Sequence, residues 1–360
     1  MKVLIVTGSY PPMKCGVGDY SYSLALALSS NPDFKIGVLT SFGDVKEDTV
    51  APVKLFPIIK EWHLSETFTV TKLIKDWSPD IVHIQYPTQG YRDGLLPYVI
   101  PIISFILRKK VVQTWHEGYS RRQAPKLFMK AVIPGGLVIV RPQYKEKLHY
   151  MLRWGMRNKV VKFIPNASAI PRNSLSDHDR CLLRKQYLKK CKRLVVFFGF
   201  VYPHKGVDLL FKIANSDTDM LVIAGEFDKQ SDYGQEIMRY ASSKPWVGHV
   251  NVPGFIPASD VAALLAVADA VILPFREGGG QWNTSIHGAV LQGVLVITTS
   301  KSLSGYDKNR NVYYAKVDDV QEMRDALDAF AGIRREFSSD VDRDEWEIIA
   351  NEHRALYRTI

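Results

Sequence analysis

Short, continuous apolar runs alternate with amphipathic stretches along most of this chain. An apolar run of about four to eight residues is typical of a parallel strand buried on both faces, whereas apolar residues three or four positions apart indicate a helix. In the first half, the pattern predicts strands at Val3–Thr7, Lys35–Thr40, Asp80–Gln85, Val111–Thr114, Leu137–Val140 and Val160–Ile164. It predicts helices near Tyr20–Ser29, Glu66–Trp77, Leu96–Arg108, Gln123–Ala131 and Gln143–Arg153.

The alternation restarts after residues 165–174, which are rich in Pro, Asn and Ser and are typical of an interdomain linker. Strands are predicted at Leu194–Gly199, Met220–Ala224, Val250–Val252, Ala270–Leu273 and Val294–Thr298. Helices are predicted near Gly206–Ala214, Gly234–Ser243, Ser259–Ala266, Ser285–Gln292 and Val320–Gly332. A final segment, Asp344 to Tyr357, has apolar residues at helical spacing and follows the second sheet, so we expect it to pack elsewhere.

Strands that alternate with helices predict an α/β protein with parallel sheets. Two such series, joined by a linker, predict two Rossmann-like, doubly wound domains. Ligands of open α/β sheets bind at the carboxyl ends of the strands. Because every candidate loop described below follows a strand, we expect both domains to direct their chemistry into one cleft.

Composition limits the class of protein. The chain has 360 residues, 46% hydrophobic and 23% charged, as in ordinary soluble globular proteins. Its longest apolar stretch, Leu95 to Leu107, is too short to span a bilayer, so we predict a core helix there, with shallow membrane contact as the alternative. Met1 and Lys2 lead directly into a strand, which predicts no signal peptide. Three cysteines without metal-ligand or redox spacing favour a reducing cytoplasm.

Positive charge is concentrated in one region. The net charge is +10, but residues 101–195 alone hold 22 Lys and Arg against 4 Asp and Glu, so the rest of the chain is net negative. This asymmetry predicts an acidic partner surface. We favour an anionic membrane, with a solvated basic face that binds nothing specific as the alternative. Nucleic acid comes last, because no nucleic-acid-binding module accompanies the charge.

The most informative loop follows the predicted strand Ala270–Leu273. Its three glycines are expected to leave backbone N–H groups bare, and good N-terminal capping residues follow for the next helix. Bare amides beside a helix N-terminus form an anion site. Glu277 lies at the mouth of this loop, where a carboxylate suits a sugar hydroxyl next to a phosphate. The glycines and capping residues are Gly278, Gly279, Gly280, Asn283, Thr284 and Ser285.

Two loops of the first half carry further candidates. Gly16, Val17 and Gly18 precede the first predicted helix and allow a ligand close to the backbone, although such a glycine turn can be purely structural. His116 lies just past a strand and can donate a hydrogen bond to a substrate hydroxyl or to a developing charge. A packed core histidine is the alternative for His116, and it is our interpretation of His83.

The second half adds a cation and a possible base site. Lys205, between a strand and a helix, can stabilise the charge on a leaving phosphate, with a solvated lysine as the alternative. Glu226, Phe255 and Ile256 follow strands and can receive a nucleobase. The sequence has no H-E-x-x-H motif, no Cys/His cluster and no repeated Asp-x-Asp, which disfavours a metal-dependent mechanism.

Together these motifs resemble glycosyltransferase family 4, retaining enzymes with the GT-B fold, over nearly the whole chain. The matching segments are Pro11 to Gly18, Asp80 to Gln85, Thr114 to Glu117, Ile164 to Asn166, Phe198 to Asp208, Leu273 to Ser285 and Gly293 to Thr299. The segment Trp346 to Tyr357 resembles the family's C-terminal helix, which crosses back to the first domain. The resemblance implies an acceptor domain, 1–168, a nucleotide-sugar donor domain, 169–343, and a returning helix, 344–360.

The resemblance also implies an activity: transfer of a hexosyl group, with retention, from a nucleotide-diphosphate sugar to a glycan or lipid-linked acceptor in cell-envelope polysaccharide synthesis. UDP is the first expectation for the donor and GDP the next. Lys205 would hold the diphosphate, Glu277 the sugar hydroxyls, and His116 the sugar and the positive charge at the reacting carbon. The glycine loops, Thr284 and Ser285 would hold the phosphates, and Glu226, Phe255 and Ile256 the base. No metal or other cofactor is implied, and the enzyme is expected in the cytoplasm, peripheral to the membrane.

Two positions depart from the family pattern. The family often has a second glutamate, whose place falls at Ser285 or near Gly288, so that the ribose would be held differently, through Glu226 or Asn283. Phe200 stands where the family commonly has an arginine, which leaves Lys205 with more of the diphosphate charge.

Other functions stay open on the sequence alone. A nucleotide-sugar epimerase or a phosphorylase would keep the fold and change the reaction. A non-catalytic, nucleotide-sugar-binding subunit would bind the donor without turnover. A basic nucleic-acid binder is the last alternative.

Overall fold

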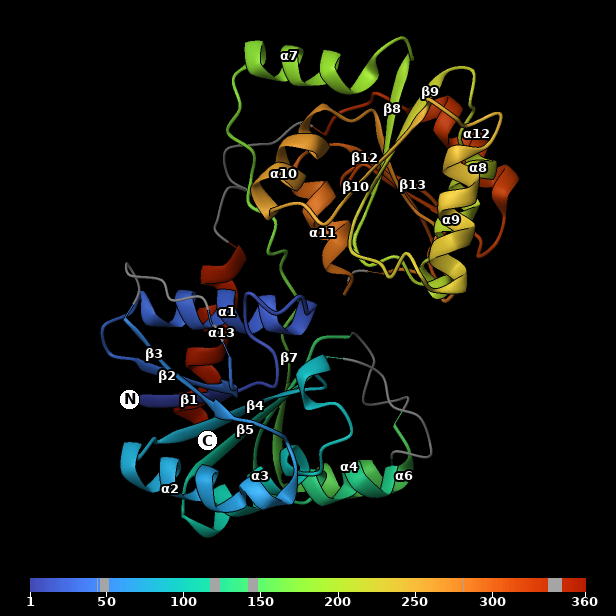
Figure 1. Ribbon diagram of the computed structural model, residues 1–360. Helices are drawn as coiled ribbons and strands as arrows, with labels where there is room; N and C mark the ends of the chain where they lie inside the picture. The colour runs from blue at the N-terminus through green and yellow to red at the C-terminus, as the bar shows by residue number, and fades with distance from the viewer. Residues whose placement is uncertain (44, 46–51, 117–123, 142–147, 281, 336–344) are drawn as a thin grey trace. The chain divides into compact units, whose positions relative to one another are not determined.

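The computed structural model describes residues 1–43, 45, 52–116, 124–141, 148–280, 282–335 and 345–360. Glu117, the predicted helix starts at Gln123 and Gln143, and Asp344 lie outside these ranges. The chain forms two compact units, each with its own sheet: residues 1–167 with 343–360, the N-terminal unit, and residues 168–342, the C-terminal unit (Figure 1).

The sheet of the N-terminal unit has seven parallel strands in the order β3-β2-β1-β4-β5-β6-β7. The strands are β1 (Lys2–Val6), β2 (Lys35–Ser41), β3 (Val53–Ile59), β4 (Ile81–Tyr86), β5 (Lys110–Trp115), β6 (Gly135–Ile139) and β7 (Lys159–Phe163). The helices are α1 (Gly16–Ser29), α2 (Thr67–Trp77), α3 (Leu96–Ile106), α4 (Ala124–Ala131), α6 (Tyr150–Gly155) and α13 (Glu345–Thr359).

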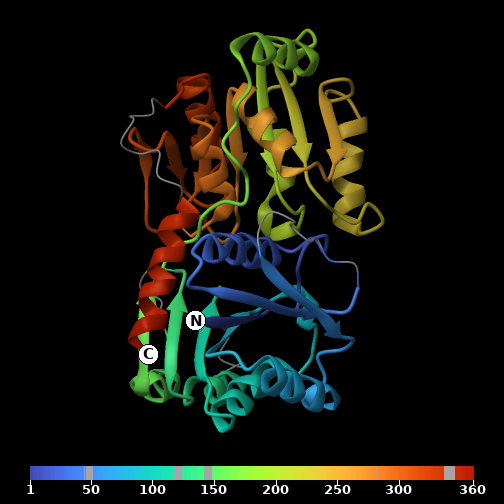
Figure 2. The same cartoon turned by 90° about the vertical axis from the view of Figure 1, so that its left-hand side faces the viewer.

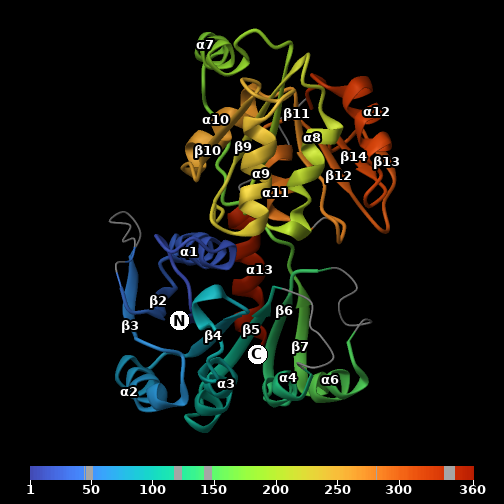
Figure 3. The ribbon, with the colours of Figure 1, turned by 45° about the vertical axis from the view of Figure 1, so that its right-hand side comes forward.

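Helices cover both faces of this sheet, which explains its nearly continuous apolar strands. Alternate residues of β1 point to opposite faces, so that Val3 and Ile5 pack on one side and Leu4 and Val6 on the other. Helices α1 and α13 cover the first side, and α2, α3, α4 and α6 cover the second (Figures 1 and 3). Helix α13 lies against α1 (Figure 2).

The C-terminal unit repeats the architecture with the order β10-β9-β8-β11-β12-β14-β13. Its strands are β8 (Arg193–Phe198), β9 (Asp219–Ala224), β10 (Val250–Gly254), β11 (Ala270–Leu273), β12 (Leu295–Thr299), β13 (Gly305–Asp307) and β14 (Val312–Ala315), and β13 alone pairs antiparallel. Its helices are α7 (Asp177–Leu188), α8 (Leu210–Ile213), α9 (Asp232–Ser242), α10 (Ala258–Val267), α11 (Thr284–Leu291) and α12 (Val320–Phe330). Helices α7, α10 and α11 lie on one face, and α8, α9 and α12 lie on the other (Figure 1).

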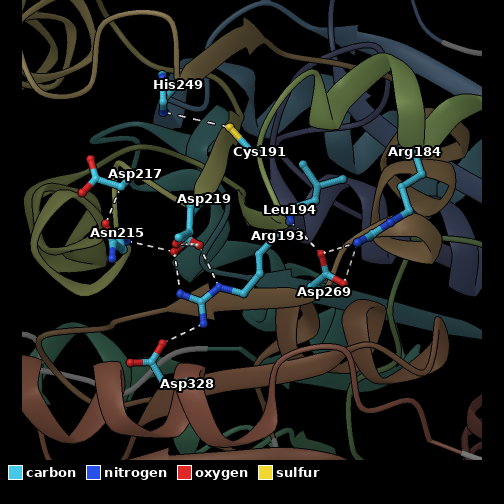
Figure 4. Close-up of polar contacts among 11 residues, drawn as sticks. Arg184, Cys191, Arg193, Leu194, Asn215, Asp217, Asp219, His249, Asp269 and Asp328 are labelled. Carbon is cyan, nitrogen blue, oxygen red and sulfur yellow. Dashed lines mark hydrogen bonds and ion pairs between the residues drawn. The ribbon is translucent and has the colours of Figure 1, made fainter.

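Ion pairs stabilise the edge of this second sheet where its parallel strands begin (Figure 4). The carboxylate of Asp219 is fully buried and accepts hydrogen bonds from the Arg193 guanidinium at 2.7 and 3.0 Å. Arg193 also pairs with Asp328 of α12 at 2.7 Å, and Arg184 of α7 pairs with Asp269 at 2.7 Å. Every charged group in these pairs has a partner, so the network stabilises the amino edge of the sheet.

The fold class predicted from the sequence is confirmed, and five details of it are corrected. Strand β3, the β13–β14 pair and helix α7 were not predicted. Helix α1 begins at Gly16, so the three residues Gly16–Gly18 form its first turn instead of a loop before it. Residues 206–214 form a 3-10 turn and the short α8, not one helix. In the described part of the chain, no helix is both long and apolar enough to cross a membrane.

Candidate functional site

Two loops meet at the carboxyl edge of the C-terminal sheet, where the strand order reverses between β8 and β11. Lys205 ends a 3-10 turn, Pro203–Lys205, which follows β8, and Glu277 lies in the loop that follows β11. The backbone N–H of Arg276 donates to the carbonyl oxygen of His204 at 3.0 Å. Direct backbone contact therefore holds the lysine loop and the glutamate loop together.

An ion-pair cluster stabilises the same two loops. The guanidinium of Arg276 pairs with Asp208 at 2.6 Å and with Asp318 at 2.9 Å. The Tyr233 hydroxyl donates to Asp208 at 2.7 Å, and burial together with that hydrogen bond raises the pKa of Tyr233 above its ordinary value. Sequence reasoning missed this cluster, although Arg276 directly precedes Glu277. Two carboxylates engage Arg276, and the Nζ of Lys205 lies 4.7 Å from the centre of the Phe275 ring.

The glycine loop is less open than the sequence suggested. The expectation of bare amides is wrong for two of its three glycines: the N–H of Gly278 donates to the oxygen of Phe275 at 3.0 Å, and that of Gly279 to the oxygen of Thr299 at 2.7 Å. The loop folds back against the end of β12, which brings these acceptors within reach. Glu277 is exposed beside them.

The N-terminus of α11 is capped as the sequence predicted. Asn283 is the N-cap, and its side-chain oxygen accepts from the N–H of Ser285 at 3.1 Å. Gly199, at the end of β8, has a positive φ of 124°, and a β-carbon there would lie 3.7 Å from the hydroxyl oxygen of Ser285, which is ordinary contact. Thr284 is exposed and Ser285 is half-buried, which leaves both hydroxyls at the carboxyl edge of the sheet.

The packing of Gly288 gives a physical reason for the missing second glutamate. Gly288 is buried within α11, and a β-carbon there would lie 2.7 Å from the hydroxyl oxygen of Ser168 and 3.1 Å from Ile170. A glutamate side chain has no room at this position. Ser285, the other position, is half-buried in the first turn of α11.

The expected base site lies at the ends of β9 and β10, next to the end of β8. The N–H of Val201 donates to the oxygen of Glu226 at 3.1 Å, and the N–H of Gly225 donates to the oxygen of Gly254 at 2.8 Å. Phe255, which follows directly, is 55% exposed, whereas Ile256 packs partly against the core. The structure thus gathers Lys205, Glu226, Phe255, Ile256, Glu277, Gly278, Gly279, Gly280, Asn283, Thr284 and Ser285 along one edge of one sheet.

Phe200, the second departure from the family pattern, is part of an aromatic row. Its ring stacks on Tyr202 at 5.9 Å between centroids, and Tyr202 stacks on His204 at 5.6 Å. In the described ranges, no group of three or more His, Cys, Asp or Glu side chains is placed to hold a metal ion.

The N-terminal unit contributes two candidates at the carboxyl edge of its own sheet. Gly16, Val17 and Gly18 form the first turn of α1, and its N-cap, Cys15, makes no side-chain capping bond. Gly18 packs tightly, since a β-carbon there would lie 3.1 Å from the oxygen of Ser9. The first-turn amides of α1 are therefore not capped by a side chain of the preceding residue, as suits an anion site.

His116 follows β5 and is 7% exposed. Its Nε2 lies 2.9 Å from Oε1 of Gln85, and its ring meets the edge of Tyr20 at 4.7 Å. Burial, and then the nearby His353, lower the pKa of His116 to about 3, so the ring is neutral near pH 7. His83 is fully buried and hydrogen bonded on both ring nitrogens, as the core interpretation requires.

Part of the chain is similar in sequence to known proteins. Residues 192–331, within the C-terminal unit, match the family model described as Glycosyl transferases group 1. A curated protein of Bacillus subtilis (strain 168), described as "Putative glycosyltransferase YtcC", is 29% identical over 133 residues, which are 34% of this chain and 31% of that protein. The match thus spans about a third of either chain, and it is consistent with the family model.

Solved structures match the whole chain at low sequence identity. HepE of Anabaena, solved in complex with UDP and glucose, has a TM-score of 0.68 at 17% identity and covers 100% of this chain and 95% of that one. Sucrose-phosphate synthase of Thermosynechococcus elongatus has a TM-score of 0.67 at 15% identity, with 100% and 98% covered. A glycosyltransferase of Rickettsia africae has 0.70 at 14% identity, with 99% and 93% covered. Likeness at this level shows the fold, which is GT-B.

Proposed function

We propose that this protein is a retaining glycosyltransferase that moves a hexosyl group from a nucleotide-diphosphate sugar to a glycan or lipid-linked acceptor. One observation carries the proposal: a lysine loop and a glutamate loop are bonded to each other beside the N-terminus of α11. Both loops lie inside the segment that matches the glycosyl transferase family model. A cation, a carboxylate and helix-terminal amides together suit a phosphorylated sugar.

Each candidate residue of the C-terminal unit has a role in this proposal. Lys205 and the first-turn amides of α11 take the charge that grows on the leaving diphosphate. Glu277, exposed at the loop, binds hydroxyls of the donor sugar. Glu226 and the face of Phe255 receive the nucleoside. UDP is the first candidate, because HepE has been solved with UDP and with UDP-glucose, and GDP is the next.

The transfer step needs no second catalytic carboxylate. The acceptor hydroxyl oxygen bonds to the anomeric carbon on the face from which the diphosphate departs, and the bond from that carbon to the phosphate oxygen breaks. The acceptor proton passes to the departing phosphate oxygen, so the configuration is retained. We place His116 and the α1 amides of Gly16 to Gly18 on the sugar and the phosphate, respectively. Lys205 and helix termini do the electrostatic work that a metal does in other transferases, so the proposal includes no metal.

The test is ligand-induced stabilisation followed by turnover. UDP, GDP, ADP, TDP and CMP, and their common sugars, are added to wild type, Lys205→Ala and Lys212→Ala, the last replacing an exposed lysine of α8 as a control. We expect one nucleotide diphosphate to stabilise wild type and Lys212→Ala but not Lys205→Ala. A ligand at 100 times its Kd adds about 2.7 kcal/mol, a visible shift in melting temperature.

Turnover separates the competing functions. With the identified donor and an acceptor extract, we expect release of nucleoside diphosphate and a product of unchanged anomeric configuration by NMR. Donor consumption without an acceptor would indicate an epimerase, and a requirement for phosphate would indicate a phosphorylase. Binding without turnover would indicate a non-catalytic subunit, and unchanged turnover in both Lys205→Ala and Glu277→Ala would exclude the proposed site.

We also propose that the enzyme works at an anionic lipid surface on the cytoplasmic face of the membrane, in cell-envelope polysaccharide synthesis. The basic region 101–195 is divided between the two units, and its residues Lys130 and Lys159 are buried. The surface that supports the proposal lies on α3, α4 and α6, which neighbour one another along one face of the N-terminal sheet (Figure 3). Its exposed side chains are Phe105, Ile106, Arg108, Lys126, Met129, Tyr150, Met151, Arg153, Trp154 and Arg157, called here the lipid surface.

A further inference from the structure

A row of buried, hydrogen-bonded polar side chains starts at His116. Its Nε2 lies 2.9 Å from Oε1 of Gln85, and Nε2 of Gln85 lies 3.2 Å from Nε2 of His83. Gln85 and His83 are fully buried. The arrangement follows from the sheet: His83 and Gln85 are two residues apart on β4, Thr114 and His116 are two apart on and just after β5, and Gln85 is the register partner of Thr114. Residues at that spacing share a face, so all four point to the side covered by α1 and α13.

This row of hydrogen-bonded side chains continues into the C-terminal helix, α13. Nδ1 of His83 lies 2.7 Å from the hydroxyl of Tyr357 on α13, and the hydroxyl of Thr114 lies 2.7 Å from Nε2 of His83. The ring of His353, also on α13, lies 5.5 Å from that of His83. All of these residues belong to the N-terminal unit. The last helix of the chain therefore closes a hydrogen-bonded network whose other end is the candidate active-site histidine.

Donor and acceptor chemistry assigns the protons. An amide oxygen only accepts, so His116 must carry a proton on Nε2 to bond Oε1 of Gln85. An amide nitrogen only donates, so Nε2 of His83 must be unprotonated, and Thr114 also donates to it. The proton of His83 is then on Nδ1, where it donates to Tyr357. A half-turn of the Gln85 amide would exchange all of these assignments, so this one side chain sets both rings.

The assignment matters because the rings are neutral. Burial is the main cause that lowers the pKa of His116 to about 3 and of His353 to about 4, and it lowers that of His83 well below the ordinary value. The ionisable neighbours in this region do not reverse this: they are Tyr20 on α1, Tyr357 and Glu352 on α13, and Lys162 on β7. A neutral imidazole has one proton, so a proton held on Nε2 leaves a lone pair on Nδ1.

We propose that Gln85 is a positioning residue that locks His116 in the Nε2–H tautomer, with Nδ1 as its hydrogen-bond acceptor. This inference rests on the proposed function for its chemical meaning, because it concerns how His116 meets the sugar. It reverses the expectation from the sequence that His116 donates to a substrate hydroxyl: the ring proton is used by Gln85, and Nδ1 accepts from the hydroxyl instead. A neutral ring with a lone pair also stabilises positive charge developing at the reacting carbon, which an imidazolium would oppose.

The tautomer is measured directly by long-range ¹H–¹⁵N NMR on the full chain labelled with [¹⁵N]histidine, with His116 assigned from the spectrum of His116→Asn. In wild type near pH 7, we expect Nε2 of His116 to be protonated and Nδ1 unprotonated. Gln85→Glu keeps an acceptor and should keep the Nε2 proton, whereas Gln85→Leu should release it into a mixture. Gln113→Leu, which removes another buried glutamine of β5 bonded to Trp115 and Lys130, is the control and should leave His116 unchanged.

Kinetics then test the role. We expect kcat for sugar transfer to fall about 10- to 100-fold in Gln85→Leu, with the affinity for nucleoside diphosphate unchanged and partial rescue in Gln85→Glu. The new carboxylate should also raise the pKa of His116. As pH is lowered, the ring of Gln85→Glu is then protonated earlier, so this variant should lose activity at a higher pH than wild type.

A wild-type proton on Nδ1, or an unchanged tautomer in Gln85→Leu, would overturn the inference even if the protein proves to be a glycosyltransferase. Conversely, absence of transfer activity would remove the proposed function while the NMR result still decides the tautomer. If Gln85→Leu does not fold, the wild-type spectrum and Gln85→Glu remain decisive.

Discussion

The β-carbon that Gly206 lacks would lie 2.2 Å from the carbonyl oxygen of Pro274, and Gly206 itself has a positive φ of 68°. The residue thus meets two demands, a left-handed backbone and close approach of the lysine loop to the glutamate loop. Either demand alone would favour glycine. Together they make this position the point at which Lys205 is held in place.

Gly206→Ala should therefore lower both stability and donor affinity. Its matched control is Gly248→Ala, because Gly248 has a φ of 87° but no heavy atom within 4 Å of the added carbon. We expect the control to lose about 1–2 kcal/mol from backbone strain, and Gly206→Ala to lose more because the contact with Pro274 must open. Melting temperatures and titration with nucleoside diphosphate measure both effects. Equal losses in the two variants would contradict the importance of the contact.

The buried histidines make stability depend on pH. The folded-state pKa values of His116 and His353, about 3 and about 4, lie below the ordinary 6.5, so the unfolded chain binds more protons as pH falls. Stability is then fully present above about pH 6.5 and is lost below it, by about 2 kcal/mol per histidine between pH 7 and pH 5. Denaturant unfolding at a series of pH values measures this slope. His353→Met should flatten it by about one proton, whereas the exposed His178→Met should not.

At the scale of elements, the central strands were predicted better than the edge strands and the polar helix α7. The central strands are continuous apolar runs in the sequence, because helices cover both of their faces, and this pattern predicted them. Strand β3 was missed because Pro57 interrupts its pattern, which an edge strand tolerates. Helix α7 was missed because none of its residues is fully buried: Leu183, Tyr187 and Leu188 pack only partly buried against the core. An ion pair from Arg184 to Asp269 adds to this contact.

The candidate site was predictable where it depends on loops and not where it depends on packing. Lys205, Glu277 and Asn283 follow strands in recognisable motifs, and the structure brings them to one edge. The hydrogen bonds that consume the amides of Gly278 and Gly279 come from the fold of the loop, which no local pattern encodes. The partners of His116 come from the neighbouring strand β4 and from two helices, α1 and the distant α13. Only the spacing of two between His83 and Gln85 signalled a shared face.

Helix α13 is attached to α1 by one buried arginine. The guanidinium of Arg354, 3% exposed, donates to the carbonyl oxygens of Ala27 and Leu28 in the last turn of α1 and pairs with Glu347 at 2.6 Å. A cation at a helix C-terminus satisfies carbonyls that have no partner within the helix. This side chain therefore joins the last helix of the chain to the first.

Arg354→Met should cost about 3 kcal/mol of unfolding free energy, because it removes the charge-assisted hydrogen bonds of a buried guanidinium to the end of α1. Arg358→Met, an exposed arginine on the same helix, is the matched control and should cost under about 1 kcal/mol. Urea denaturation compares the two. Because α13 also carries Tyr357, Arg354→Met should in addition broaden the His83 signals in the histidine NMR spectrum, whereas a variant as stable as the control would show that α13 is held by its apolar face alone.

For the whole molecule, the distribution of charge across units matters more than the net charge of +10. The basic region 101–195 supplies α6 in the N-terminal unit and α7 in the C-terminal unit, but only α6 combines cations with exposed aromatic rings. Trp154 is 54% exposed, stacks on Phe128 at 5.9 Å and carries Arg157 over its ring at 4.5 Å. A ring with one wet and one apolar side beside cations suits a lipid headgroup layer.

We therefore expect binding to vesicles of anionic lipid that depends on the N-terminal unit. Each cation near such a surface contributes about 1 kcal/mol, so replacing Lys126, Arg153 and Arg157 by Gln should weaken binding about 100-fold at low salt. The control replaces three exposed cations of the α7 region, Arg180, Lys185 and Lys190, and should bind like wild type. Cosedimentation at low ionic strength and at about 1 M salt, where the Debye length falls to about 3 Å, measures the electrostatic part. Equal loss in both triple variants, or equal binding to vesicles of neutral lipid, would mean that total charge rather than the lipid surface accounts for any membrane affinity.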